Sequence, residues 1–198
     1  MPKKTFFNLS VEKRNKIIDA AYDLFIENDY KDVSIRNITN KAGISIGSFY
    51  QYFYDKDDLY LYIMTEIEKK IYARHKERTE QYLTDPEIIP IEEVCSPKEI
   101  ALNRTWYDAP VEVKMKFYFG EYSKEMNSIV WDELVELEKQ GKLVEDLDLE
   151  LIFHLYVTTM FNILMYFDEK NITDEEERIR IKRKYYTDWF INGILKKR

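Results

Sequence analysis

The fold of this chain is decided by residues 34–53, SIRNITNKAGISIGSFYQYF. Apolar residues recur there at helical spacing on both sides of a glycine, and they are Ile38, Ala42, Ile44, Phe49 and either Tyr52 or Phe53. Ser34 and Ser45 are each placed to cap the start of a short helix. Gly43 lies between the two helices, where a sharp turn needs a residue that adopts positive φ at little cost. The pattern predicts a helix-turn-helix motif, in which two crossing helices share one small core.

The outward face of the second helix suits the major groove of DNA. It carries Ile46, Gly47, Ser48, Tyr50 and Gln51, with no acidic side chain among them. Hydroxyl and amide groups can hydrogen-bond to base edges and phosphates, and a face without carboxylates does not repel the phosphates. The motif therefore predicts DNA binding.

The composition indicates an all-α protein with a sizeable core. The chain has 198 residues, of which 45% are hydrophobic and 34% charged, and it holds only five Gly and five Pro. Such values, with little period-2 alternation, favour helices throughout. The single cysteine, Cys95, excludes an internal disulfide and fits a reducing cytoplasm. No signal peptide is expected at the start, and polar residues within the most apolar run, residues 151–167, leave it short of a membrane span.

The net charge of −7 is distributed unevenly along the chain. Residues 1–54 carry eight basic and six acidic side chains, a net charge of +2, whereas the remainder carries −9. This mild asymmetry predicts that affinity for phosphates comes from a few placed groups and from two copies of the DNA-binding domain.

Helix signals divide the chain into two domains. Residues 2–9 are expected to form a loose arm before a helix over about residues 10–28. Asp55 begins a long helix without Gly or Pro, and Thr173 is expected to open the last helix. The predicted domains are residues 1–54, which contain the motif at 34–53, and residues 55–198, a larger helical domain.

The first domain also resembles a known family. The segments IIDAAYDLF, IRNITNKAGIS, GSFYQYF and DKDDL, within about residues 10–63, are similar to the DNA-binding domain of the tetracycline-repressor (TetR) family. The resemblance implies a three-helix DNA module, a larger all-helical domain that binds a small molecule, and homodimerisation through the last two helices. The sequence departs from the family at Asp29, where Gly is common, at Thr39, where Ala is usual, and at Ile46, where a polar or basic residue often occurs.

The resemblance also assigns roles to individual residues. Ser34 and Tyr50 match positions that hold DNA phosphates, and Lys56 matches a lysine that caps the DNA contact from the start of the fourth helix. The positions that match ones facing base edges or nearby backbone are Arg36, Ile46, Gly47, Ser48 and Tyr52. For Tyr52 a core position is an equally good interpretation. With the motif itself, the candidate DNA-binding residues are Ser34, Arg36, Ser45, Ile46, Gly47, Ser48, Tyr50, Gln51, Tyr52 and Lys56.

An effector pocket is expected in the second domain. His154, Thr158, Asn162 and Tyr166 stand four residues apart and share one helical stripe. They would supply the polar wall of a pocket whose apolar wall comes from Trp106, Phe117, Tyr118, Tyr122 and Met126. The alternative places the stripe in the dimer interface, where Trp189 and Phe190 are the expected aromatic anchors.

These observations predict a cytoplasmic, homodimeric regulator that binds operator DNA and is a repressor released by a small molecule. No His or Cys pair has the spacing of a zinc site, and no phosphate loop or hydrolase motif occurs, so no catalytic residue, metal or cofactor is expected. The alternatives are an enzyme or a helical protein-interaction module that carries the motif without binding an operator.

Overall fold

The computed structural model describes residues 1–79 and 90–195. Within these ranges the chain is helical, with no β-strand and one isolated bridge between Leu143 and Leu195, so the predicted all-α class is confirmed. The chain divides into two compact units. The first comprises Met1–Ile71 and Pro90–Tyr122, and the second comprises Tyr72–Ile89 and Ser123–Arg198. The predicted domain boundary after residue 54 stays a prediction.

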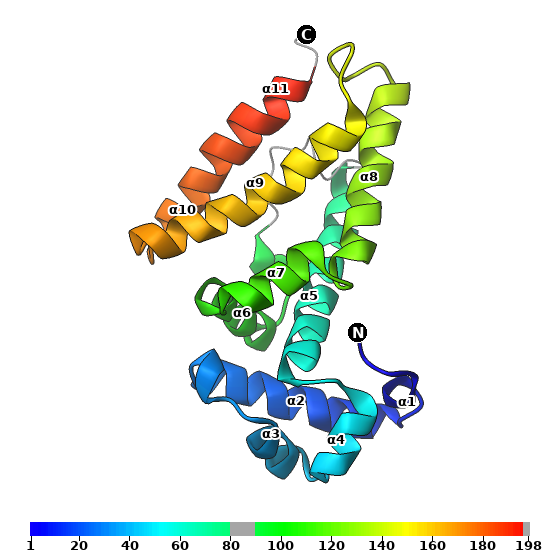
Figure 1. Ribbon diagram of the computed structural model, residues 1–198, viewed down its shortest axis with the longest axis vertical. Helices are drawn as coiled ribbons and strands as arrows, with labels where there is room; N and C mark the ends of the chain where they lie inside the picture. Colours follow the sequence, from blue (N-terminus) through cyan, green and yellow to red (C-terminus); the bar gives the residue numbers. More distant parts are fainter. Residues whose placement is uncertain (80–89, 196–198) are drawn as a thin grey trace. The chain divides into compact units, whose positions relative to one another are not determined.

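The first unit contains the N-terminal helices and the segment that follows the long helix. Its elements are α1 (Lys4–Phe7), α2 (Val11–Glu27), the 3-10 helix η1 (Tyr30–Asp32), α3 (Ile35–Ala42), α4 (Ile46–Tyr52), the first part of α5 (Lys56–Thr79), the 3-10 helix η2 (Ile91–Glu93), α6 (Pro97–Arg104), the 3-10 helix η3 (Thr105–Asp108) and α7 (Val111–Phe119). The helices α2, α3 and α4 pack together as the predicted three-helix module (Figure 1).

The core of the first unit is made by side chains at helical spacing. Ile17, Ala21 and Phe25 of α2, Ile38 of α3, Phe49 of α4 and Leu59, Tyr60 and Ile63 of α5 are all at most 2% exposed. The ring of Tyr60 lies 4.8 Å from that of Phe25, which fixes the start of α5 against α2. This burial stabilises the module by the removal of apolar surface from water.

The expected loose arm is wrong, because residues 2–9 are ordered on the module. They contain α1, whose Phe6 is fully buried and lies 4.7 Å from the ring of Phe53. The sequence carries too few residues there for a periodic signal, so the contact with a distant aromatic residue could not be predicted.

Two departures from the family pattern fit the local backbone. Asp29 has a φ of −57°, so a glycine is not needed at this position. Thr39 is 1% exposed, and its hydroxyl donates to the carbonyl of Arg36 at 3.0 Å, which satisfies its polar group inside the core.

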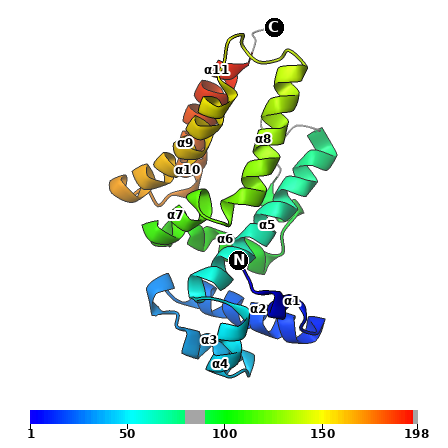
Figure 2. The ribbon, with the colours of Figure 1, turned by 45° about the vertical axis from the view of Figure 1, so that its right-hand side comes forward.

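The second unit contains the end of α5 and the C-terminal helices. These are α8 (Ser123–Lys139), α9 (Leu149–Lys170), α10 (Glu175–Lys182), the π-helical segment η4 (Arg183–Ile191) and α11 (Asn192–Ile194). Asp174, rather than Thr173, caps α10 by accepting from the amide of Glu177 at 2.8 Å. Figures 1 and 2 both show α9 side by side with α10 and η4.

The core of the second unit lies between these helices. It consists of Val130, Leu134, Leu137, Leu143, Ile152, Ile191 and Ile194, with partly buried residues that include Phe153, Tyr156, Tyr186 and Phe190 packed against it. α9 is also long and apolar enough to cross a membrane by length and composition, which corrects the expectation that it falls short. A core helix passes the same test, and Ile152 of α9 belongs to this core. Only 22% of its most apolar window is buried, so α9 leaves apolar side chains such as Leu151 and Leu155 exposed.

Candidate nucleic-acid interface

The helix-turn-helix motif is confirmed, and its turn is closed by short-range hydrogen bonds. Gly43 adopts the left-handed conformation with φ 67° and ψ 36°, and the amide of Ile44 donates to the carbonyl of Thr39 at 3.0 Å. The hydroxyl of Ser34 accepts from the amide of Asn37 at 3.2 Å, and that of Ser45 accepts from the amide of Ser48 at 3.0 Å. Both helices therefore begin with the predicted serine caps.

The outward face of α4 is open to solvent. Ile46 and Tyr50 are 47% and 48% exposed, and Gly47 and Gln51 are exposed beside them. A Cβ on Gly47 would meet only the Ser45 hydroxyl, at an ordinary 3.8 Å, so the fold itself does not require glycine there. With no Cβ at this position, the exposed face of α4 leaves room for the close approach of another backbone.

Two of the candidate residues on α4 point elsewhere. Tyr52 is 6% exposed, with its ring 6.5 Å from that of Phe6, so it occupies the core position that the sequence left open. The hydroxyls of Ser48 and Ser45 lie 2.9 Å apart, and this hydrogen bond holds Ser48 beside the start of the helix. The surface available to a ligand on α4 is therefore centred on Ile46, Gly47 and Tyr50.

The basic side chains around the motif differ in what they contact. Lys16 is paired with Glu12 at 2.8 Å, and Lys41 with Asp23 at 3.0 Å. Arg36 and Lys13 are exposed and form no ion pair within the part of the chain that the structure describes. Lysine and arginine side chains without an acidic partner are the ones free to neutralise phosphates.

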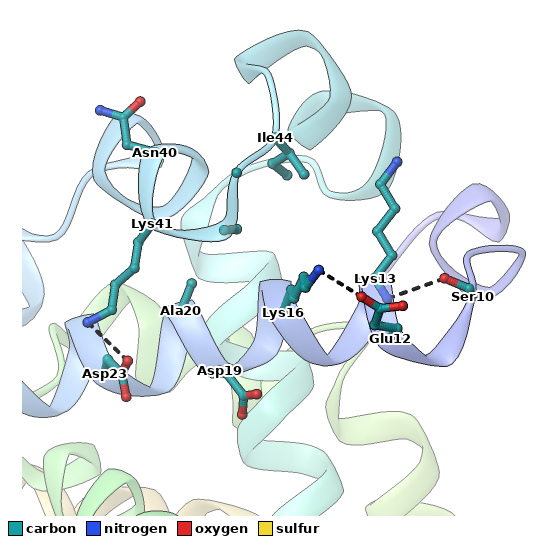
Figure 3. Close-up of a pocket in the computed structure, with 12 residues that line it drawn as sticks. Ser10, Glu12, Lys13, Lys16, Asp19, Ala20, Asp23, Asn40, Lys41 and Ile44 are labelled. Atoms are coloured by element: carbon teal, nitrogen blue, oxygen red, sulfur yellow. Dashed lines mark hydrogen bonds and ion pairs between the residues drawn. The ribbon is translucent and has the colours of Figure 1, made fainter.

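Lys13 lies at a cleft that the sequence did not reveal. The cleft, of about 750 Å³, lies between α2 and the turn that joins α3 to α4, and Figure 3 shows Lys13 extending from α2 toward the Ile44 side. Lys13 has Ile17 four residues on, whereas Lys16 has Glu12 four residues back. The spacing rule for helical ion pairs therefore separates Lys13 from Lys16, but it does not detect the pairing of Lys41 with the distant Asp23.

Lys56 connects the start of α5 to the segment before α3. Its ammonium donates to the carbonyls of Tyr30 and Val33 at 2.7 and 2.8 Å and lies 4.6 Å from the centre of the Tyr30 ring. Burial lowers the pKa of the Lys56 ammonium, opposed by Asp57 and Asp32. Two of its three donors are used within the protein, so the predicted phosphate contact has one N–H left.

Asp57, in the first turn of α5, binds partners on both sides. It accepts from the Tyr30 hydroxyl at 2.6 Å and from the Lys116 ammonium of α7 at 2.6 Å. Burial would raise the pKa of Asp57, but the hydrogen bonds from Lys116 and Tyr30 outweigh it and lower the pKa. One carboxylate therefore joins the DNA module to α7 within the first unit.

The neighbouring Asp58 is buried and also reaches beyond its own helix. It is 5% exposed and accepts from the amide of Tyr54 at 3.0 Å. The hydroxyl of Tyr122 donates to its carboxylate and, at 2.7 Å, to its backbone carbonyl. The first turn of α5 is consequently held by residues of η1, of α7 and of the segment after α7, and by the ammonium of Met1, which pairs with Asp58 at 2.7 Å.

The predicted pocket residues fall into both units. In the first, Trp106 is 9% exposed and lies 4.9 Å from the ring of Phe117, next to Tyr118, and the Tyr122 hydroxyl is occupied by Asp58. Met126 and the polar stripe belong to the second unit. The shared pocket stays a prediction, and the contacts of Trp106 and Tyr122 are those of core aromatic residues.

The polar stripe lies on the surface of the second unit. His154, Asn162 and Tyr166 are exposed, and the Thr158 hydroxyl donates to the His154 carbonyl at 2.8 Å. Asn162 and Tyr166 line a groove of about 600 Å³ between α9 and the segment that contains α10 and η4. The other residues lining the groove are Thr159, Ile163, Glu177, Arg180, Ile181, Lys184 and Tyr185. Among the described residues no cluster of three His, Cys, Asp or Glu side chains is placed to hold a metal ion.

Sequence comparisons match the N-terminal part of the chain to known regulatory proteins. Residues 17–63 match the family model of bacterial regulatory proteins of the tetR family. The chain is 37% identical over 84 residues to the HTH-type transcriptional regulator HbdR of Aromatoleum sp., a match covering 42% of this chain and 34% of the relative. It is 35% identical over 82 residues to the uncharacterized HTH-type regulator YwcC of Bacillus subtilis, covering 40% and 37%. The chain thus matches little more than a third of the length of these relatives.

The likeness to solved structures extends over most of the chain. The crystal structure of the transcriptional regulator FadR from Bacillus subtilis, in complex with stearoyl-CoA, has a TM-score of 0.54 with 18% identity. That likeness covers 91% of this chain and 98% of the other, and at this identity it concerns the fold alone.

Proposed function

We propose that this chain, whose N-terminal part belongs to the tetR family of bacterial regulatory proteins, is a cytoplasmic transcriptional regulator that binds operator DNA as a homodimer. We further propose that it is a repressor that a small organic molecule releases from the operator. The relatives that match its N-terminal part are named transcriptional regulators. No enzymatic activity is part of the proposal.

The observation that carries the proposal is the exposed, acid-free face of α4. Ile46 and Tyr50 are half exposed on this short helix, and Gly47 between them is not required by the packing. A second helix of a helix-turn-helix reads base edges with its N-terminal residues. Ile46 is suited to the methyl group of thymine, Gly47 to close approach of the backbone, and the Tyr50 hydroxyl to a phosphate.

The surrounding groups are proposed to position the motif on the duplex. Ser34 caps α3, Arg36 lies in the first turn of α3, and Lys13 lies in the first turn of α2. Neither Arg36 nor Lys13 has an acidic partner among the described residues. Such contacts give affinity without reading sequence, and their loss lowers the salt dependence of binding by about one unit of slope per charge.

The test is binding to fragments of the genome that contains the gene, followed by titration at several salt concentrations. Specific binding that weakens as salt rises is expected, together with altered operator preference for Ile46→Thr. Arg36→Ala should instead weaken binding to all operator variants alike and flatten the salt slope. Lys31→Ala is the control, since Lys31 is exposed on η1 and lies beside Asp29. A protein without any specific, salt-sensitive binding would not be an operator-binding regulator.

The homodimer is proposed to form through α9 and the helical segment after it. Large apolar side chains are exposed along both, namely Leu151, Leu155, Tyr166, Ile179, Tyr185 and Trp189. An exposed apolar surface of this kind marks a site of association, and a second copy would place two recognition helices on half-sites about 34–36 Å apart. His154, Thr158 and Asn162 share this surface, which favours the interface interpretation of the polar stripe.

Effector release is proposed to act through the first turn of α5. Asp57 binds Tyr30 of the DNA module and Lys116 of α7, while Asp58 binds Tyr122. A small molecule that binds one arrangement of these contacts better than another shifts the population in proportion to that difference in affinity. The aromatic residues Phe117 and Tyr118, which pack beside the core residue Trp106, would suit a flat or amphipathic organic molecule.

A further inference from the structure

The C-terminal end of the recognition helix α4 is covered by the N-terminal segment of the chain. The Lys3 ammonium donates to the carbonyl of Tyr50 at 2.7 Å, and the Lys3 amide donates to the carbonyl of Tyr52 at 2.8 Å. Between them, the Thr5 hydroxyl donates to the carbonyl of Gln51. The last carbonyls of a helix have no partner within the helix, so these bonds supply what the helix lacks.

The segment is anchored to the module by its own side chains. Phe6 is fully buried, with its ring 4.7 Å from that of Phe53 and 5.5 Å from that of Tyr62 on α5. The Lys3 ammonium also lies 4.3 Å from the centre of the Tyr54 ring. The burial of Phe6 thus holds the backbone of residues 3–5 at the end of α4. The hydrogen bonds from Lys3 and Thr5 to α4 are therefore supported by apolar packing nearby.

The recognition helix needs such support because it is short. α4 has seven residues, and isolated helices shorter than about 12–15 residues are marginal in water. Its start is capped by Ser45, but its last turn has no basic residue and its end has no left-handed glycine. A lysine ammonium from elsewhere therefore provides both the hydrogen bond and the positive charge that a helix C-terminus favours.

We infer that Lys3 and Thr5 are positioning residues for DNA recognition, which act by capping the C-terminus of α4. The carbonyls that they bind belong to Tyr50, Gln51 and Tyr52, and two of these residues carry side chains on the proposed DNA face. A frayed last turn moves the Tyr50 hydroxyl away from its phosphate. The inference rests on the proposed operator binding, although the cap itself can be measured without DNA.

The cap is tested by hydrogen exchange of the free protein. Thr5→Val removes the hydroxyl at constant shape, and Lys3→Met removes the ammonium while keeping an unbranched stem. Both should speed the exchange of amides near the end of α4 by about two- to tenfold, the equivalent of one net hydrogen bond. Thr5→Ser should restore the wild-type exchange. Lys4→Met is the matched control, because Lys4 is exposed on α1 and bonds to no carbonyl of α4 in the described structure. Wild-type exchange in Thr5→Val, or failure of Thr5→Ser to restore it, would overturn the cap.

The link to recognition is tested by operator affinity of the same variants. Thr5→Val should raise the Kd by about two- to tenfold with an unchanged salt slope, since the hydroxyl carries no charge. Thr5→Ser should again restore the wild-type value. Faster exchange with an unchanged Kd would overturn the positioning role while leaving the cap in place. A wild-type protein that binds no operator would overturn the proposed function instead, and the exchange data would still decide the cap.

Discussion

At the scale of single residues, one substitution at the exposed Gly47 can test helix stability and operator binding independently. Gly47 has room for a Cβ, so Gly47→Ala should stabilise α4 by up to about 1 kcal/mol. If the backbone there approaches DNA closely, the added methyl group should nevertheless weaken operator binding. Thermal unfolding and a binding titration measure the two effects. Gly193→Ala in α11, where a Cβ also meets open space, is the control that should leave operator affinity unchanged.

Lys56 stabilises the fold in addition to its predicted contact with a phosphate. Lys56→Met leaves the carbonyls of Tyr30 and Val33 without their donor, so the free energy of unfolding should fall by about 1–3 kcal/mol. Urea unfolding measures this loss, and Lys16→Met is the control because an exposed pair with Glu12 contributes about 0.3–0.5 kcal/mol. A variant as stable as the wild type would contradict the structural role. If the salt slope of operator binding by Lys56→Met is also lower by about one unit, Lys56 makes the predicted phosphate contact as well.

At the scale of elements, the first turn of α5 is where the DNA module and α7 meet through one carboxylate. Tyr30→Phe and Lys116→Met each remove one bond to Asp57, so their effects on unfolding should not add. A double-mutant cycle should give a coupling of about 0.5–3 kcal/mol. Tyr30→Phe with Lys98→Met is the control cycle, because Lys98 pairs with Asp23 instead and the effects should add.

The same contact sets a pH dependence whose sign follows from the lowered pKa of Asp57. A carboxylate with a lowered folded pKa stabilises the folded state fully above its ordinary value of 3.8, and this contribution is lost as the pH falls through the folded value. The stability difference between wild type and Lys116→Met should therefore shrink below about pH 4. An equal difference at neutral pH and at pH 3 would show that the charge on Asp57 is not involved.

At the scale of the whole molecule, two adjacent aromatic residues separate assembly from folding. Trp189 is 74% exposed, whereas Phe190 packs against the core of the second unit with its ring 6.2 Å from that of Tyr186. Trp189→Ala should therefore weaken the proposed dimer by at least about 2 kcal/mol, or roughly 30-fold, with little effect on melting. Phe190→Ala should lower the melting temperature and leave any remaining folded protein dimeric. Ultracentrifugation and circular dichroism measure both, and a Trp189→Ala protein that sediments as the wild type would exclude Trp189 as an anchor.

The sequence by itself determined the helix-turn-helix and the all-helical class, because the interactions that form them are local. The hydroxyls of Ser34 and Ser45 bind amides three residues on, and Gly43 takes a conformation that glycine adopts at little cost. Periodic apolar residues such as Ile38 and Phe49 then face one core. These signals all lie within a few residues of the structure that they specify.

Only the tertiary structure decided which side chains remain free to act. The contact of Lys3 with α4 joins residues 47 positions apart, and the bonds of Lys56 join residues 23 and 26 positions apart. Hydrophobic periodicity does not predict how far apart such segments lie in the fold. The sequence also does not indicate whether a lysine will bind a carbonyl or a phosphate. The exposure of Trp189 and the burial of Tyr52 likewise depend on which other elements pack against them, and a local sequence pattern does not predict this.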